Sequence, residues 1–168
     1  MEQLIIAIDP DTEKSGVAYF TIGTSGIKLK TFSFFDLLEF LKEKRNLINM
    51  VIVEASWLIK KSNWHSNKNG SNYGSAIGAR TGANHETGKK IVEMLEYLKI
   101  PVCLKRPLKK VWKGSSGKIS HKEFIHLLAS NQCEPIKRSN QEERDSFLLL
   151  LSEYQNLSKR KIFKNSNF

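Results

Sequence analysis

Cysteines, acidic residues and long apolar runs are all scarce in this 168-residue sequence, and each shortage narrows the class of protein. The two cysteines, Cys103 and Cys133, lie far apart without the spacing of a metal site, which favours reduced thiols in a cytoplasmic protein. No apolar run approaches the roughly 18 residues of a membrane span. The N-terminus also lacks the charged-then-apolar pattern of a signal peptide. We therefore expect neither membrane association nor secretion.

Acidic residues are outnumbered, because 17 Asp and Glu face 27 Lys and Arg, for a formal net charge of +10. This excess favours a polyanionic partner, of which nucleic acid is the leading candidate. Net charge alone leaves open that the protein is merely basic. The length suits a single domain, which we place at residues 1–157, and the basic, polar residues 158–168 are expected to form a flexible tail.

The pattern of apolar residues predicts an α/β protein. Three strands in an antiparallel meander are expected near residues 3–9, 15–22 and 27–33. Residues 56–73 show no period and are expected to form a long exposed loop. The remaining predicted elements are a helix over 36–45, a strand over 50–54, a helix over 76–99, a strand over 101–104, a basic loop over 105–118, and helices over 120–129 and 141–154.

Four acidic residues have defined places in this scheme. Asp9 ends the first strand, because Pro10 cannot continue a ladder, and Glu54 ends the fourth, which neighbours the first if a helix crosses back to the sheet. Glu142 and Asp145 are three residues apart near the start of the last helix, so they share a face. Each acid alone is more readily a turn former or a solvated side chain than a ligand. Together, in so basic a chain, they predict an oxygen-only site for Mg²⁺ or Mn²⁺, with two ions about 3.5–4 Å apart that support phosphodiester cleavage.

Three stretches resemble a known family. Residues 8–18, which read IDPDTEKSGVA, resemble the opening motif of the RuvC Holliday-junction resolvases. Residues 51–54 (VIVE) and 142–146 (EERDS) are similar to that family's second acid and to its paired acids. The resemblance covers about residues 4–151 and is strongest to the compact phage-type members. It implies the RNase H-like fold, with a central mixed five-stranded sheet flanked by helices.

By this resemblance, the four acids would be the metal ligands and catalytic residues of a Mg²⁺-dependent endonuclease that resolves Holliday junctions by paired nicks. Two positions depart from the family pattern. Asp11 stands where the family usually has Gly, and Glu142 stands where it usually has Asp. The longer Glu142 side chain could shift one metal ion, and Asp11 could join the cluster.

The family also has a lysine near the active site after the fifth strand, and residues 106–113 resemble that region. We favour Lys113 as this lysine, with Lys109 and Lys110 as alternatives. Such a lysine could stabilise charge on the scissile phosphate. A solvated basic loop explains any one of the three equally well.

The expected loop over 56–73 combines lysines with aromatic residues and is a candidate DNA contact. Its lysines could follow phosphates while Trp64 or Tyr73 stacks on an unpaired base near the crossover, whereas Trp57 is expected to pack back on the domain. The candidate DNA-binding residues are Lys60, Lys61, Trp64, Lys68, Tyr73, Lys109 and Lys110.

Symmetric cutting of a four-way junction normally calls for a twofold homodimer, and the apolar residues of the helix over 76–99 could supply its interface. Two other functions remain open. One is a less structure-selective RNase H-like nuclease or nickase, including one that acts on RNA–DNA hybrids. The other is a catalytically silent nucleic-acid-binding module.

Overall fold

The computed structural model describes residues 3–24, 26–59 and 71–159, and it describes side chains for residues 3–24, 26–59 and 78–154. The strands are β1 (Leu4–Asp9), β2 (Ser15–Thr21), β3 (Ile27–Phe32), β4 (Ile48–Glu54) and β5 (Val102–Lys105). The α-helices are α1 (Phe34–Lys44), α2 (Ser71–Tyr97), α3 (His121–Ser130) and α4 (Gln141–Lys159). The helix and strand order predicted from the sequence is therefore confirmed in the described residues.

The five strands form one mixed sheet in the order β3-β2-β1-β4-β5. β1 pairs antiparallel with β2 on one side and parallel with β4 on the other, so it lies at the centre of the sheet. Because β1 and β4 are parallel neighbours, with Ile8 opposite Val53, their last residues Asp9 and Glu54 emerge at the same end of the sheet. This is the mixed five-stranded α/β architecture that the sequence predicts.

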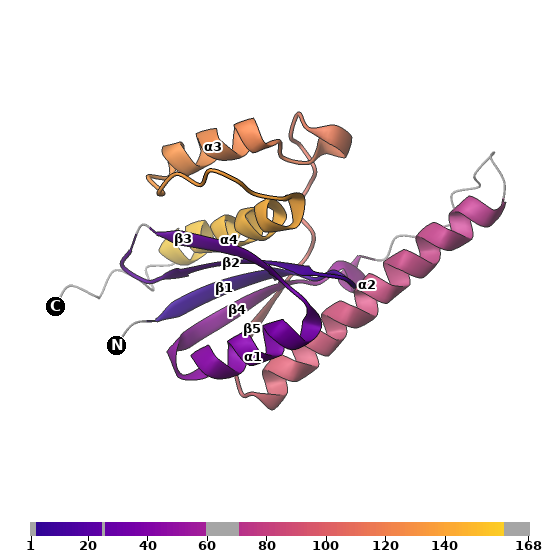
Figure 1. The fold of residues 1–168 in the computed structure, drawn as a ribbon, viewed down its shortest axis with the longest axis horizontal. Coiled ribbons are helices and arrows are strands. Elements are labelled where there is room, and N and C mark those ends of the chain that lie inside the picture. The colour runs from indigo at the N-terminus through magenta and orange to yellow at the C-terminus, as the bar shows by residue number, and fades with distance from the viewer. Residues whose placement is uncertain (1–2, 25, 60–70, 160–168) are drawn as a thin grey trace.

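Helices cover both faces of the sheet, with α1 and α2 on one side and α3 and α4 on the other (Figure 1). The unbroken apolar sequence of β1 reflects burial on both faces, because its residues alternate between two hydrophobic cores. Ile6 and Ile8 pack with α1 and α2, while Ile5 and Ala7 pack with α3 and α4. A strand buried on both faces has no solvent side on which polar residues would be favoured. None of the helices among the described residues has the length and apolarity to cross a membrane.

Three helix starts are fixed by capping side chains. Ser33 caps α1 by accepting a hydrogen bond from the backbone N–H of Asp36. Ser120 and Glu123 form a capping box at the start of α3. Asn140 caps α4, because its Oδ1 accepts from the N–H of Glu143 at 2.8 Å, while the Glu143 carboxylate accepts from the N–H of Asn140 at 2.9 Å. Reciprocal caps of this kind satisfy otherwise unpaired backbone donors and set where the helix begins.

Two helix boundaries differ from the sequence prediction by five residues. The loop expected over 56–73 contains a 3₁₀ helix at Ser56–Leu58 and ends where α2 begins, at Ser71 instead of residue 76. Helix α4 continues to Lys159, beyond the expected end at 154 and across the boundary drawn at 157. At the start of α2, polar and glycine-containing sequence weakens the apolar period that indicates a helix. At the end of α4, a polar run conceals the same period.

The apolar residues of α2 do not form a free interface as proposed from the sequence. Ile91 and Leu95 of α2, together with Leu98 just after the helix, are buried and belong to the core of their own domain. Trp57 also packs on this core, as expected. Its ring lies so close to α2 that position 88 of the helix has room for glycine only. The buried part of the apolar period of α2 is therefore explained by folding of one chain, whereas Tyr97 is exposed.

Candidate active site

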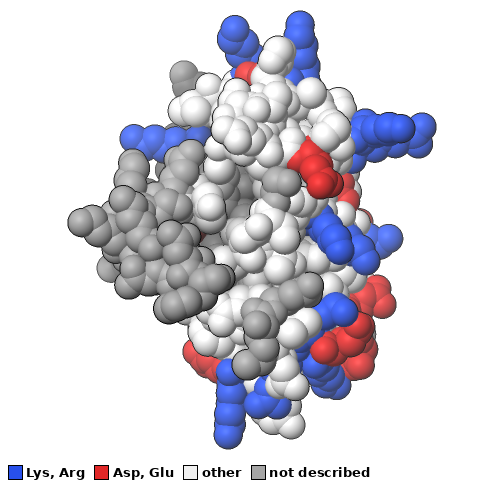
Figure 2. Space-filling model, turned by 90° about the vertical axis from the view of Figure 1, so that its left-hand side faces the viewer, with Lys and Arg blue, Asp and Glu red and all other residues white. Residues whose placement is uncertain are grey.

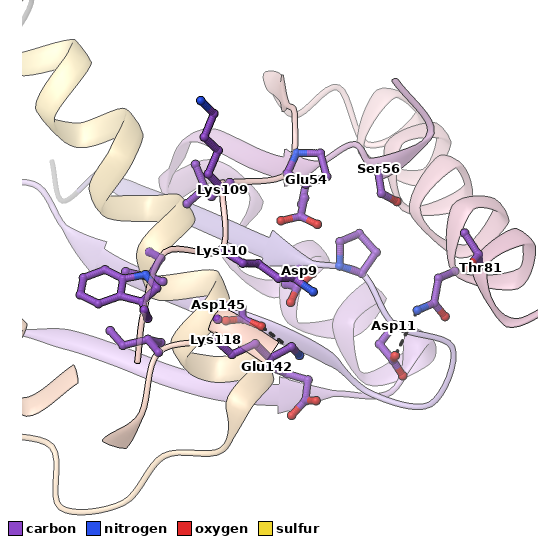
Figure 3. A pocket seen from close by; sticks show the side chains of 18 of the residues that line it. Asp9, Asp11, Glu54, Ser56, Thr81, Lys109, Lys110, Lys118, Glu142 and Asp145 are labelled. Atoms are coloured by element: carbon purple, nitrogen blue, oxygen red, sulfur yellow. Dashed lines mark hydrogen bonds and ion pairs between the residues drawn. The ribbon is translucent and has the colours of Figure 1, made fainter. Parts of the chain in front are cut away.

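A cavity of about 340 Å³ opens at the end of the sheet where β1 and β4 finish. All four predicted acids line it, and Figure 3 shows their carboxylates on the two sides of Asp9. Asp9 and Glu54 come from adjacent strands, while Glu142 and Asp145 come from the first turns of α4. Three elements far apart in the sequence thus bring carboxylates into one cavity.

Burial dominates the electrostatics of Asp9, the residue at the centre of the cavity. Its pKa is raised well above the ordinary value, first by burial and then by the negative charges of Glu54 and Asp145, with a smaller effect from Glu142. Lys118 opposes this shift without cancelling it. A buried carboxylate among other carboxylates takes up a proton more readily unless a cation compensates its charge. The cavity therefore has an affinity for positive charge.

Glu54 behaves in the same way at the neighbouring strand end. Burial raises its pKa first, and the charge of Asp145 adds to the effect. Lys110 and Lys118 both lower the pKa of Glu54, so two ammonium groups lie close enough to compensate part of its charge. In Figure 3 the side chain of Lys110 reaches across the carboxylates, whereas that of Lys109 points away from them.

Asp145 is held by two neighbours, one on each carboxylate oxygen. Gln141 Nε2 donates to Asp145 Oδ1 at 2.7 Å, and Lys118 Nζ lies 3.4 Å from Asp145 Oδ2. The carboxylate is therefore oriented by its own helix and by the segment that precedes α3.

The donor set fits a divalent cation by its chemistry, because four carboxylates supply only hard oxygen ligands and lysines compensate only part of their negative charge. In the described residues, however, no three His, Cys, Asp or Glu side chains are arranged so that they could hold a metal ion together. Binding of an ion would require some of these side chains to turn toward a common point. Rotation of side chains at the cavity surface is a small change compared with backbone movement.

Asp11, which could join the acid cluster by the sequence argument, makes its contacts elsewhere. Its Oδ1 accepts from the backbone N–H of Glu13 at 2.9 Å, and its Oδ2 accepts from Asn84 Nδ2 at 3.3 Å. Asp11 therefore ties the turn after β1 to α2. It lines the same cavity, but on the wall formed by α2 (Figure 3).

Lys118, a residue that sequence reasoning did not select, contacts one of the four carboxylates, that of Asp145. Lys109 and Lys110 line the cavity as expected, but Lys113, the favoured choice, is not among the lining residues. The backbone N–H of Lys113 instead donates to Glu123 Oε1 at 2.9 Å. The sequence holds no local signal that singles out Lys118, because which lysine of a basic loop faces a site depends on loop geometry.

None of the predicted loop contacts has a described side chain. Lys60, Lys61, Trp64 and Lys68 lie outside the described residues. Tyr73 belongs to the first turn of α2, and its side chain also lies outside the description.

A second cavity, of about 480 Å³, differs in chemistry and position. It lies at the opposite end of the sheet, between the β2–β3 turn and the ends of α3 and α4, and no Asp, Glu, Lys or Arg is among its described lining residues. Figure 2 shows this end of the molecule, where charged side chains stand mainly around the margin. The clustering of acids with lysines is therefore a property of the first cavity.

No protein-family model matches the chain, and no curated protein matches it. Among solved structures, the chain is similar to Thermus thermophilus RuvC in complex with a Holliday junction substrate, with 14% identity over 93% of this chain and 96% of that chain and a TM-score of 0.52. Thermus thermophilus RuvC in another structure gives 16% identity, 93% and 97% coverage and a TM-score of 0.44. YeaZ from Pseudomonas aeruginosa gives 12% identity, 65% and 46% coverage and a TM-score of 0.35. At 14% identity the likeness to the first of these structures concerns the fold alone, and it confirms the RuvC-like, RNase H-like fold that the sequence motifs imply.

Proposed function

We propose that this protein is a Mg²⁺-dependent endonuclease that cuts branched DNA, most of all Holliday junctions, by paired nicks. The observation that carries the proposal is the convergence of Asp9, Glu54, Glu142 and Asp145 on one cavity of a RuvC-like fold. The similar Thermus thermophilus RuvC is in complex with a Holliday junction substrate, which supports this choice of substrate. The compact phage-type resolvases remain the subgroup that the sequence motifs favour.

The surroundings of the cavity support a polyanionic substrate. Residues 105–122 contain seven Lys and Arg and no Asp or Glu. Within the described part of the chain, ion pairs engage only Lys105 and Lys118 of these seven, with Glu153 and Asp145 respectively. The other five cations remain available to phosphates, and such contacts give binding that weakens as salt rises. DNA would thereby be drawn over a cavity whose own charge is negative.

The carboxylates have a defined task in this proposal. Asp9, Glu54, Glu142 and Asp145 would hold the cation, with Mn²⁺ able to replace Mg²⁺ and two ions expected. When bound, the cations supply an activated water and charge stabilisation for in-line cleavage. Because the pKa of Asp9 is raised, a proton competes with the cation for this carboxylate. Lys110 and Lys118, which face the carboxylates, would stabilise charge on the scissile phosphate.

Two symmetric cuts call for two active sites, so we propose a twofold homodimer. Ile91 and Leu95 of α2, and Leu98 just after it, are used within one chain, and the dimer contact is therefore assigned to other surfaces. Lys60, Lys61, Trp64, Lys68 and Tyr73 remain proposed contacts to the branch point.

The decisive experiment compares cleavage of labelled four-way junctions, flaps and linear duplex, with Mg²⁺ and with EDTA. Wild type should cut the four-way junction best and only with the metal. Glu54→Gln should bind the junction with wild-type affinity and lose more than about 100-fold in rate, since even the partners of metal ligands matter by about 10–100-fold. Glu96→Gln, which changes an exposed acid of α2, is the matched control and should cut normally.

Each other outcome selects a different function. Equal cutting of all three DNAs would indicate a less selective nuclease. Junction binding without any cutting by wild type would indicate a silent binding module. Normal cutting by Glu54→Gln would show that the assignment of the carboxylates is wrong.

A further inference from the structure

Arg144 joins three segments at the edge of the cavity, although it does not line the cavity itself. Its guanidinium makes four hydrogen bonds. Nε donates to the carbonyl of Ile119 at 3.2 Å, Nη1 donates to the carbonyl and hydroxyl oxygens of Ser139 at 2.7 and 3.3 Å, and Nη2 donates to Gln141 Oε1 at 3.0 Å. All three nitrogens of this partly buried, planar group are therefore engaged. One binds the segment before α3, one binds Ser139 and one binds the first residue of α4.

One of these bonds leads directly to a candidate metal ligand. Because Arg144 binds the amide oxygen of Gln141, the amide nitrogen of Gln141 points the other way, to Asp145 Oδ1 at 2.7 Å. The two ends of an amide differ in hydrogen-bonding character, so fixing the oxygen also fixes which atom meets the carboxylate. Without Arg144, the Gln141 side chain would be free to rotate and Asp145 would lose one oriented oxygen.

A second bond leads to the other side of the same carboxylate. Arg144 holds the carbonyl of the buried Ile119, the residue directly after Lys118. Lys118 Nζ lies 3.4 Å from Asp145 Oδ2. One guanidinium thus fixes both of the groups that contact the two oxygens of Asp145.

We propose that Arg144 is a positioning residue, which sets the orientation of Asp145 through Gln141 and through the segment that contains Lys118. This inference rests on the proposed function only in assigning Asp145 to cation binding. The proposed effect of Arg144 comes from its hydrogen-bond geometry and not from its charge. The charges that act on Asp9 and Glu54 are those of neighbouring carboxylates and of Lys110 and Lys118. A planar fork is required for this arrangement, and the point charge of a lysine cannot reproduce it.

The test uses Arg144→Lys, which keeps the charge and removes the fork, with Arg45→Lys on the exposed turn after α1 as the matched control. Binding of Mn²⁺ to the protein without DNA is measured by titration calorimetry. Arg144→Lys should weaken Mn²⁺ binding by about 10-fold, the lower end of the range for partners of metal ligands. Junction cleavage should fall by a similar factor at limiting metal, while junction affinity stays within about twofold because no phosphate contact is lost. Arg45→Lys should leave all three quantities unchanged.

Gln141→Ala provides a second, independent variant with little risk to folding. If Arg144 acts through Gln141, the double variant should bind Mn²⁺ at most about twofold more weakly than the Arg144→Lys single variant, because residues that act as one unit are not additive. Fully additive losses, or wild-type Mn²⁺ affinity in folded Arg144→Lys or Gln141→Ala, would overturn the inference. The NMR signal of the Gln141 side-chain amide should also move in Arg144→Lys, and an unmoved signal would contradict the proposed contact. Calorimetry and NMR decide these points even if wild type cuts no DNA, an outcome that would count against the proposed function alone.

Discussion

Gly16 lies directly beneath the first turn of α4, and its nearest neighbour there is the backbone of Glu142. A Cβ atom at Gly16 would stand 2.1 Å from the carbonyl oxygen of Glu142 and 2.4 Å from its carbonyl carbon. Gly16 is also the residue that pairs with Asp9 across the β1–β2 ladder. The absence of a side chain at this one position therefore sets how closely the acids of α4 approach the acid of β1.

The first prediction concerns this contact. Gly16→Ala should push the start of α4 away from the sheet and lower the free energy of unfolding by about 1–3 kcal/mol, the usual cost of overpacking. Cleavage by the folded variant should fall more than stability alone explains, because Glu142 and Asp145 move with the helix. Urea unfolding and junction cleavage are the measurements.

Gly26→Ala is the control for Gly16→Ala, because its Cβ would approach no atom closer than 3.7 Å. It should change stability by less than about 0.5 kcal/mol, the normal range for surface substitutions. If Gly16→Ala unfolds and cuts like this control, the close approach of β2 and α4 does not govern the cavity.

The sheet and the four acids were predictable because each depends on local sequence. The apolar run that stops at Asp9-Pro10 marks a central strand and its end, and Asn140 with Glu143 marks the start of α4. Parallel pairing of β1 with β4 then brings Asp9 and Glu54 together without further information. Strand ends and helix caps are encoded within a few residues, so they can be identified in a single sequence.

The contacts between irregular segments were not predictable. Lys118 reaches Asp145 because Gly117, with a φ of 74°, and the capping box at Ser120 turn the chain back toward α4. Lys113 is closer in sequence to the resembling stretch, but its backbone is held by Glu123 outside the cavity lining. Which lysine of a basic loop faces a site depends on loop geometry, and loop geometry leaves no period in the sequence.

The second prediction concerns the buried acid and pH. In the folded protein the pKa of Asp9 is raised, so between the ordinary pKa and the raised one the folded state binds more protons than the unfolded state. Stability from this group is therefore full at low pH and is lost as pH rises through the raised pKa. Asp9→Asn removes the titration, so without divalent cations it should be more stable than wild type at pH 7.5 by about 1–3 kcal/mol, the usual penalty for an uncompensated buried polar group.

The stability difference between Asp9→Asn and wild type should shrink as pH falls toward 4, as measured by urea unfolding at several pH values. Asp36→Asn on the exposed first turn of α1 controls for the loss of one negative charge. A constant difference across the pH range would contradict burial of a titrating Asp9.

The third prediction concerns the packing of Trp57 on α2. A Cβ at Gly88 would stand 2.4 Å from Trp57 Cζ3, whereas a Cβ at Gly82 in the same helix would meet nothing within 4 Å. Gly88→Ala should therefore destabilise the protein by about 1–3 kcal/mol through overpacking. Gly82→Ala should stabilise it by up to about 1 kcal/mol, because alanine favours the helix. The sign of the difference, read from thermal unfolding, tests whether Trp57 anchors the end of β4 to α2.

The fourth prediction separates the lysine that the structure brings to the carboxylates from the one that the sequence favoured. Lys118 lowers the pKa of both Asp9 and Glu54, and it contacts Asp145. Lys118→Met should let the pKa values of Asp9 and Glu54 rise further, so the acidic limb of the cleavage profile should move to higher pH. At pH 7 the rate should fall by about 100-fold, as when an electrostatic donor is removed from an active site.

Lys113→Met should lower the rate by no more than about threefold, because an exposed charge outside the cavity contributes little and only through DNA attraction. Its effect should disappear as salt is raised, since screening removes long-range attraction. The effect of Lys118→Met should persist in high salt, because a charge in direct contact with partly buried carboxylates is screened much less. The reverse pattern, with a shifted pH profile in Lys113→Met and a salt-sensitive defect in Lys118→Met, would restore Lys113 as the active-site lysine.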